Sequence, residues 1–403
     1  MSMSTSPVDR SAKPTALILG AGYAGLTAAH EVYRRARGRI SVRLVDRHPV
    51  HVLRTELYEV GKLAASGTRD APWLVPIRTV LGSSEIEFVT AEVDGIDLAG
   101  RIVRAGGASL PFTYLVIALG SVAAFYHVDG AAEHTHRVYR FSEARRLAEA
   151  IRGLEVASAR GPPGPGPRIA VVGGGSTGTE VAAEIATADW AKIAAPGSRP
   201  PTVVLVCGAL PFLAGLPDGL VGHARRILSK AGIAMDEGEN VVAVAADHLT
   251  LAGGRTLPFD LCVWATGVRA PDAIASLPVD HGRGGRVKVT TTLEIPGHSG
   301  VFAIGDCAEI EDPVTHMTVP QTAQAALAEA PVAAANLVAR FRARDPSPFV
   351  YRERGTIVAA GVGQAAGTVR RVTVWGSPAA LLKSLVQKEY AIAVEHGRHP
   401  PGL

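Results

Sequence analysis

Cysteine is scarce in this chain of 403 residues. The three cysteines, Cys207, Cys262 and Cys307, lie far apart, and neither a C-x-x-C pair nor a zinc-ligand spacing occurs. This pattern argues against a disulfide framework and against a cysteine zinc site. Each cysteine lies in or beside an apolar run of strand type, so we expect three small buried hydrophobic residues in a reducing compartment.

Long apolar runs and a strong charge are also missing. No run of about 18 apolar residues occurs, and so we expect no membrane-spanning segment. Residues 1–14 are rich in Ser, Thr and Pro and lack the apolar core of a signal peptide, which predicts a disordered terminus and a cytoplasmic protein. The net charge is only +4, without a basic cluster, which argues against a nucleic-acid partner. The histidines have no metal-ligand spacing, and we expect no metal.

Glycine is abundant, with 44 residues, and two glycine-rich fingerprints stand out. Each one closes an apolar, strand-like run and opens a helix-like run; they are Gly20-Ala-Gly22-Tyr-Ala-Gly25 and Gly173-Gly-Gly175-Ser-Thr-Gly178. Such glycines make a tight turn, let backbone N–H groups approach a pyrophosphate, and let helix and strand pack closely. A single fingerprint is often only a turn, but a correctly placed pair predicts two bound dinucleotides.

The order of strand and helix patterns predicts an α/β fold with two tandem Rossmann-like dinucleotide-binding modules and a small C-terminal region. The first module begins with strands 15–19 and 40–45 around helix 22–37. After a Gly/Pro connector at 161–167 the pattern restarts, with strands 168–172 and 202–206 around helix 177–187. The expected organisation is a disordered stretch 1–14, a first module at 15–140 and 285–345, a second at 141–284, and a C-terminal region at 346–403. Pro331 is expected to break an Ala-rich helix at 321–340.

In these motifs the chain resembles the two-dinucleotide FAD/NAD(P)H flavoproteins, and in detail it is similar to type II NADH dehydrogenases, single-subunit NADH:quinone oxidoreductases. The segments that carry the resemblance are GAGYAGL at 20–26, ELYEV at 56–60, YLVIALGS at 114–121, GGGSTGTEVAAE at 173–184, VWATGV at 263–268, VFAIGDCAE at 301–309 and TAQAA at 322–326. Sulfur-dependent reductases share this fold, but the absence of a cysteine before residue 207 disfavours disulfide and peroxide reductases.

The resemblance implies FAD in the first module and NAD(P)H in the second. Asp46 lies about twenty residues after the third glycine, where a carboxylate can bind the adenosine ribose, although an ordinary loop aspartate is the alternative. The expected FAD residues are Gly20, Gly22, Gly25, Asp46, Ala118, Gly120, Ser121, Asp306 and Ala323. The expected nucleotide residues are Gly173, Gly175, Gly178, Cys207, Ala265, Thr266 and Gly267.

The resemblance also suggests candidate catalytic residues. Glu180 is expected beside the flavin and nicotinamide, although an acidic residue in a first helical turn is also what the helix dipole favours. Gln324 is expected to face the acceptor pocket, and Lys383 lies in the C-terminal region that borders the quinone entrance in the related enzymes. That region, 378–394, has amphipathic spacing, which fits a packed helix, a dimer seam or peripheral attachment to the inner face of the membrane.

Two departures from the family pattern affect specificity. The second strand of the nucleotide module ends on Cys207 instead of an acidic residue, and no Arg adjoins it in the sequence; we expect a weakened preference for NADH over NADPH. The family helix commonly reads AQ-x-A-x-Q-Q, whereas this chain has Ala328 and Glu329 at the last two positions. Glu329 is expected to add a charge to the acceptor pocket.

The favoured function is transfer of a hydride from NAD(P)H to FAD, followed by electron transfer to a quinone. The alternative is a soluble NAD(P)H-dependent flavoprotein reductase of a specialised small molecule or partner protein, which the altered acceptor helix would permit. A non-catalytic flavoprotein that binds a partner is a third class, and the chain offers no additional interaction domain for it.

Overall fold

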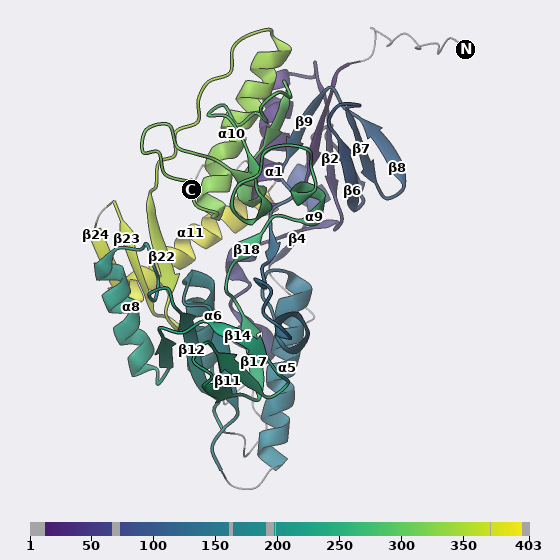
Figure 1. Cartoon of the computed structure of the whole chain (residues 1–403). Coiled ribbons are helices and arrows are strands. Elements are labelled where there is room, and N and C mark those ends of the chain that lie inside the picture. The colour runs from purple at the N-terminus through teal and green to yellow at the C-terminus, as the bar shows by residue number, and fades with distance from the viewer. Residues whose placement is uncertain are drawn as a thin grey trace.

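The computed structural model describes residues 13–66, 73–160, 164–190, 197, 199–370 and 372–396. Most of the expected N-terminal tail and part of the expected connector at 161–167 lie outside these residues. Two parallel sheets in separate lobes form the centre of the described structure (Figure 1). This α/β architecture confirms the fold class predicted from the sequence.

The first parallel sheet has the strand order β20-β9-β1-β2-β5. Its strands are β1 Thr15–Leu19, β2 Ser41–Asp46, β5 Glu87–Thr90, β9 Tyr114–Ile117 and β20 Val301–Ala303. Strands β1, β9 and β20 consist almost entirely of buried apolar residues, as expected for a parallel sheet covered on both faces. β20 enters beside β9 after almost two hundred intervening residues, so the chain returns to this sheet as the sequence pattern indicated.

Helices α1, Tyr23–Ala36, and α10, Ala323–Phe341, pack against each other beside this sheet (Figure 1). The expected break at Pro331 is wrong, because α10 continues through it. The proline removes one backbone hydrogen bond. The buried alanines on both sides of it, Ala330, Ala333 and Ala334, hold the helix in place through close packing.

The second parallel sheet has the order β13-β12-β11-β17. Its strands are β11 Arg168–Val172, β12 Thr202–Gly208, β13 Ala234–Glu237 and β17 Leu261–Trp264, with α6 Ser176–Thr187 following β11 and α8 Asp218–Lys230 following β12. The repeat of strand, glycine turn, helix and parallel strand confirms the two tandem Rossmann-like modules predicted from the sequence. The remaining helices are α2 Val60–Ser66, α3 Ile77–Leu81, α4 Ala131–His134, α5 Phe141–Arg160 and α9 Asp272–Ala275.

Besides three two-stranded sheets, the described residues form three antiparallel sheets of three strands each. The first is made of β6 Val93–Asp97, β7 Ile102–Ala105 and β8 Ala108–Pro111, and the second of β14 Val241–Val244, β15 His248–Leu251 and β16 Thr256–Pro258. The third contains β22 Gly355–Ala359, β23 Ala365–Val369 and β24 Val372–Gly376, followed by helix α11, Ser377–Glu395. This C-terminal unit packs against α6 and α8 of the second lobe and against α3 of the first (Figure 1).

The glycine turn of the first lobe depends on a contact that permits no side chain. A Cβ added at Gly25 would collide with the carbonyl oxygen of Gly20, whereas one added at Gly153, on the exposed face of α5, would meet nothing. We expect Gly25→Ala to lower the free energy of unfolding by about 1–3 kcal/mol through overpacking. Gly153→Ala should raise it by about 0.5–1 kcal/mol because alanine favours a helix. Urea unfolding of both variants is the measurement, and equal stability of the two would contradict this account of the turn.

Candidate functional site

One large cleft of about 1420 Å³ connects the carboxyl ends of the two parallel sheets. Both glycine turns line it, and so do side chains from the loops after β9, β17 and β20. Ligands of open parallel sheets bind at such strand ends. The structure therefore brings into a single cavity the two fingerprints that the sequence separates by about 150 residues.

The first turn is held by backbone and carboxylate contacts. Gly20 N–H donates to Val45 O at 2.7 Å, and Ala21 N–H donates to Asp46 Oδ2 at 2.7 Å. The other oxygen of Asp46 accepts from His48 N–H at 2.8 Å. Asp46 lines the cleft as expected. Its carboxylate also fixes the turn, a role that the sequence reading did not predict.

Two glycines leave the helix ends open to the cleft. Gly22 is the N-cap of α1 and Gly175 is the N-cap of α6, and neither provides a side-chain cap. A Cβ at either position would meet no protein atom within 4 Å, so the empty space on that side belongs to the cleft. The free N–H groups of two helix ends therefore face the same cavity, and such ends favour anionic groups.

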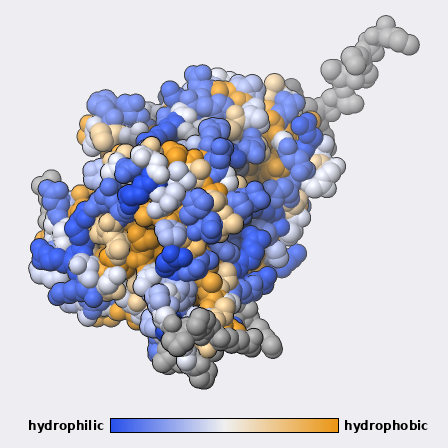
Figure 2. Space-filling view, turned by 60° about the horizontal axis from the view of Figure 1, so that its bottom comes forward, coloured by the Kyte–Doolittle hydropathy of each residue, from blue (hydrophilic) through white to orange (hydrophobic). Residues whose placement is uncertain are grey.

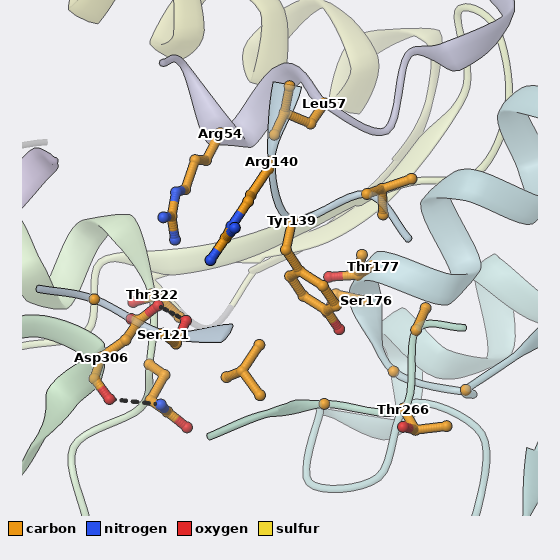
Figure 3. A pocket seen from close by; sticks show the side chains of 18 of the residues that line it. Arg54, Leu57, Ser121, Tyr139, Arg140, Ser176, Thr177, Thr266, Asp306 and Thr322 are labelled. Atoms are coloured by element: carbon orange, nitrogen blue, oxygen red, sulfur yellow. Dashed lines mark hydrogen bonds between the residues drawn. The ribbon is translucent and has the colours of Figure 1, made fainter. Parts of the chain in front are cut away.

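Side chains from three separated segments meet near the first turn. Ser121 Oγ donates to Asp306 Oδ2 at 2.7 Å, and Gln321 Nε2 donates to the Asp306 carbonyl at 2.8 Å (Figure 3). Ala118 and Gly120 line the same wall, together with Ala323 in the first turn of α10. The expected residues of the first module thus line one part of the cleft, except Gly25, which packs against Gly20 and is not among the lining residues. Gln321 was not predicted as a site residue, because the sequence placed it at the start of the Ala-rich helix, whereas it lies in the loop before α10.

The sequence reading missed two arginines of the cleft wall. Figure 3 shows Arg54 and Arg140 extending into the cavity, while Tyr139 lies on the side of Ser176 and Thr177. Burial, and then repulsion from Arg47, lowers the pKa of Arg140. The fold keeps this positive charge in the cleft wall although burial and repulsion disfavour it, which indicates an anionic ligand. Neither arginine belongs to a motif, so spacing alone could not have identified them.

The predicted acceptor helix departs from expectation at two residues. The Gln324 carboxamide accepts from Tyr351 O–H at 3.0 Å and from Arg354 N–H at 3.1 Å, and Gln324 is not among the residues that line the cleft. Glu329 is buried and accepts from Gly305 N–H behind the Gly305-Asp306 turn. Burial raises the pKa of Glu329 to about 7. The structure therefore does not place the Glu329 carboxyl in the cleft, because α10 turns that face towards the core.

Glu180 and Lys383 form an ion pair across the C-terminal unit, joining α6 to α11. Only 13% of the Glu180 side chain and 14% of the Lys383 side chain are exposed. Glu180 Oε1 also accepts from Ala359 N–H at 3.1 Å, and the Lys383 ammonium lies 4.7 Å from the centre of the Tyr58 ring. Both residues line the cleft, so the structure brings these two candidate catalytic residues together.

A second cavity of about 640 Å³ begins at this ion pair and is rich in carboxylates. Its walls include Glu56, Glu59 and Glu184, and Lys62 pairs with Glu59. Glu184 Oε1 accepts from Lys62 N–H at 3.3 Å. Burial, and next the Glu59 charge, raises the pKa values of Glu56 and Glu184 to about 7. Glu184 lies one helical turn after Glu180, which is the only sequence signal that could have linked it to the site.

The second glycine turn is built like the first. Gly173 N–H donates to Val206 O at 2.8 Å, and a Cβ at Gly178 would collide with Gly173 O. Ala265, Thr266 and Gly267 follow β17 into the cleft, where Thr266 Oγ1 donates to Ala124 O at 3.1 Å. Cys207 lines the far end of the cleft with its sulfur beside Gly174, and burial raises the pKa of its thiol to about 12. The expected residues of the second module therefore line the cleft, except Gly178, which packs against Gly173 and is not among the lining residues.

The described residues support neither a metal site nor a membrane-spanning helix. No group of three or more His, Cys, Asp or Glu side chains there could hold a metal ion. None of the helices in those same ranges is long and apolar enough to cross a membrane.

Comparisons with known proteins agree with this geometry. The family model for pyridine nucleotide-disulphide oxidoreductases matches residues 14–330. The NADH dehydrogenase-like protein Rv1812c of Mycobacterium tuberculosis is 33% identical over 315 residues, which are 75% of each chain. The type II NADH:quinone oxidoreductase of Staphylococcus aureus is 27% identical and covers 92% of this chain and 93% of its own.

The fold is also similar to a solved structure of low sequence identity. NDH2 from Plasmodium falciparum, solved in complex with NADH, superimposes with a TM-score of 0.82 at 15% identity, covering 97% of this chain and 100% of its own. At that identity the similarity concerns the fold alone.

The buried carboxyl of Glu184 predicts a pH-dependent cost to stability. Burial raises its folded pKa to about 7, above the ordinary value of 4.5, so the folded state keeps a proton that the unfolded state releases between these values. Stability should therefore fall as pH rises from about 4.5 to 7. Glu184→Gln removes this cost, so its unfolding free energy relative to wild type should increase by on the order of 1–3 kcal/mol between pH 5 and pH 8.

Urea unfolding at the two pH values measures this difference. Gln364→Ala is the matched control, because it alters the same cavity without removing a titratable group. Its stability relative to wild type should be the same at both pH values. If the unfolding free energy of Glu184→Gln differs from that of wild type by the same amount at pH 5 and pH 8, the raised pKa of Glu184 would be disproved.

Proposed function

We propose, because this chain belongs to the pyridine nucleotide-disulphide oxidoreductase family, that it transfers a hydride from NAD(P)H to FAD and delivers the electrons to a quinone. The observation that carries this proposal is the single cleft into which both glycine turns open. Two dinucleotides bound there would have their pyrophosphates on the N-termini of α1 and α6. Their reactive rings would then meet in the space between.

The first lobe fits FAD. Gly22 leaves room for a pyrophosphate, and Arg54 and Arg140 supply positive charge within the same wall. Asp46 keeps lone pairs for ribose hydroxyls, and Asp306 and Ser121 present oxygens suited to the ribitol chain. When bound, FAD supplies the hydride acceptor and the electron donor of the reaction.

The second lobe fits the nicotinamide nucleotide. The turn with Gly173, Gly175 and Gly178 would bind the pyrophosphate, and the nicotinamide ring would lie along the backbone of Ala265 and Gly267, which line the cleft. Tyr126 and Tyr139 line the same region. These residues orient the donor and exclude water from the space where the hydride moves.

The acceptor would bind where the first turn of α10 meets β22. Ala323, Ala326 and Ile357 provide an apolar wall, and Lys383 provides one cation. Reduction of a quinone by NADH consumes one proton from solvent. We assign Lys383 Nζ to hold a proton next to the acceptor oxygen, and Glu180 to position that ammonium.

Peripheral attachment to a membrane is part of the proposal. On α11, Leu381, Leu385 and Ile392 are more than half exposed, and on neighbouring β24 so are Val372 and Trp375. Figure 2 shows apolar residues exposed among hydrophilic ones on one face of the molecule. Such side chains suit the interface of a bilayer, where a quinone resides, and a homodimer seam is the competing use of the same face.

One observation favours the alternative of a soluble reductase with another small-molecule or protein acceptor. The only glutamine kept from the expected quinone helix, Gln324, is bound to the segment at 351–355 and does not line the cleft. Poor turnover with ubiquinone and menaquinone analogues, together with fractionation in the soluble phase, would favour this second function.

Rapid mixing without oxygen tests the leading function directly. Addition of NADH to protein that contains FAD should bleach the flavin absorbance near 450 nm within seconds, on the order of typical enzyme turnover. A ubiquinone or menaquinone analogue should then restore it. Flavin that stays oxidised after NADH is added would refute the oxidoreductase activity. Flavin that is bleached but not reoxidised by any quinone would refute a quinone as the acceptor.

Lys383→Met should separate the two half-reactions. Because the proposed role concerns the acceptor, reoxidation by quinone should slow roughly 10- to 100-fold while bleaching by NADH stays within about twofold. Lys383→Arg should retain part of the activity. Lys388→Met, which removes an exposed lysine of the same helix, is the matched control and should leave both rates unchanged. Equal losses in the two half-reactions would contradict the assigned role.

A further inference from the structure

The far end of the cleft, beyond the second glycine turn, is almost free of polar side chains. Its lining residues in the described structure are Val206, Cys207, Gly208, Leu210, Pro211, Ala214, Asn240, Val241 and Val242. The Cys207 thiol is neutral, since burial raises its pKa to about 12. Asn240 is therefore the one strong hydrogen-bonding side chain in this set.

The carboxylates close to this end are all engaged elsewhere. Glu237, at the end of β13, pairs with Arg225 at 2.6 Å and accepts from Phe212 N–H at 3.2 Å. Asp236 pairs with Arg255 at 2.7 Å. None of these side chains lines the cleft. The fold thus brings Arg225 near Cys207, which the sequence did not reveal, but Glu237 holds its guanidinium.

Asn240 is fixed in one orientation. Its Oδ1 accepts from Ala209 N–H at 2.9 Å, and its own carbonyl accepts from Ala252 N–H at 2.9 Å. A backbone N–H can only donate, so the atom that meets it is the side-chain oxygen, and the amide NH₂ is the group left for the cleft. Gly208, with φ of +75°, allows this approach, because a Cβ there would lie 2.9 Å from Asn240 Oδ1.

We propose that Asn240 is the residue that recognises the adenosine 2′-position of the nicotinamide nucleotide, and that its amide accepts both NADH and NADPH. The inference rests on the proposed function and deepens it. A neutral N–H donor can bond to the 2′-hydroxyl of NADH or to the 2′-phosphate of NADPH. A carboxylate in the same place would bind the hydroxyl and repel the phosphate.

Asn240→Asp is the decisive variant. The two side chains have the same shape, and one Asp oxygen can still accept from Ala209 N–H, so only the charge at the 2′-position changes. Calorimetric dissociation constants for NAD⁺ and NADP⁺ are the readout. We expect wild type to discriminate between them by less than tenfold, and the variant to bind NADP⁺ about tenfold or more weakly while keeping or improving NAD⁺ affinity.

Ser229→Asp is the matched control, because it adds the same charge at an exposed position of α8 in the same lobe. Its ratio of the two constants should stay within twofold of wild type. A ratio that Asn240→Asp leaves unchanged, or a wild type that already rejects NADP⁺ by more than a hundredfold, would overturn the inference.

This binding measurement is independent of flavin reduction. A protein that binds both nucleotides with the expected ratios but whose flavin is not reduced would refute the proposed function and leave the role of Asn240 intact. If NADH alone reduces the flavin and Asn240→Asp does not weaken the binding of NADP⁺, the proposed function would stand and the role of Asn240 would be refuted.

Discussion

The structure depends on the close approach of backbone at two glycine turns. In each lobe a strand must reverse into a helix so tightly that the first and last glycines of the fingerprint touch, which leaves no room for a Cβ. The middle position then opens a helix N-terminus to the cleft. This steric requirement leaves two uncapped helix ends facing one cavity, and the free N–H groups of such ends favour anions.

The chain completes this cavity with segments that return from far along the sequence. β20 and α10 bring Asp306 and Ala323 back to the first lobe, and α11 brings Lys383 to Glu180, 203 residues earlier. The C-terminal unit contacts both lobes and places Lys383 beside Glu180 of the second lobe. It therefore joins the two lobes at the end of the cleft that these two residues line.

The sequence predicts those features that a local pattern determines. The glycine turns, the parallel strands and Asp46 at a strand end follow from spacing, because strand ends and turns limit the allowed residues there. Asp306 was expected only from the family resemblance. Features that depend on packing were missed. Pro331 lies inside a helix that its neighbours hold in place, and Gln324 and Glu329 turn away from the cleft because α10 buries that face. Arg140 and Asn240 reach the cleft from loops and Arg54 from the short 3-10 helix Arg54–Glu56, where no periodicity indicates their direction.

The central claim is that two dinucleotides meet in one cleft, and a structure of the protein with FAD and a nicotinamide nucleotide bound tests it most directly. The account predicts one pyrophosphate on the turn at Gly20–Gly22, the other on the turn at Gly173–Gly175, and the nicotinamide stacked on the flavin between them. A nucleotide found outside this cleft, or a flavin that does not occupy the first turn, would contradict it.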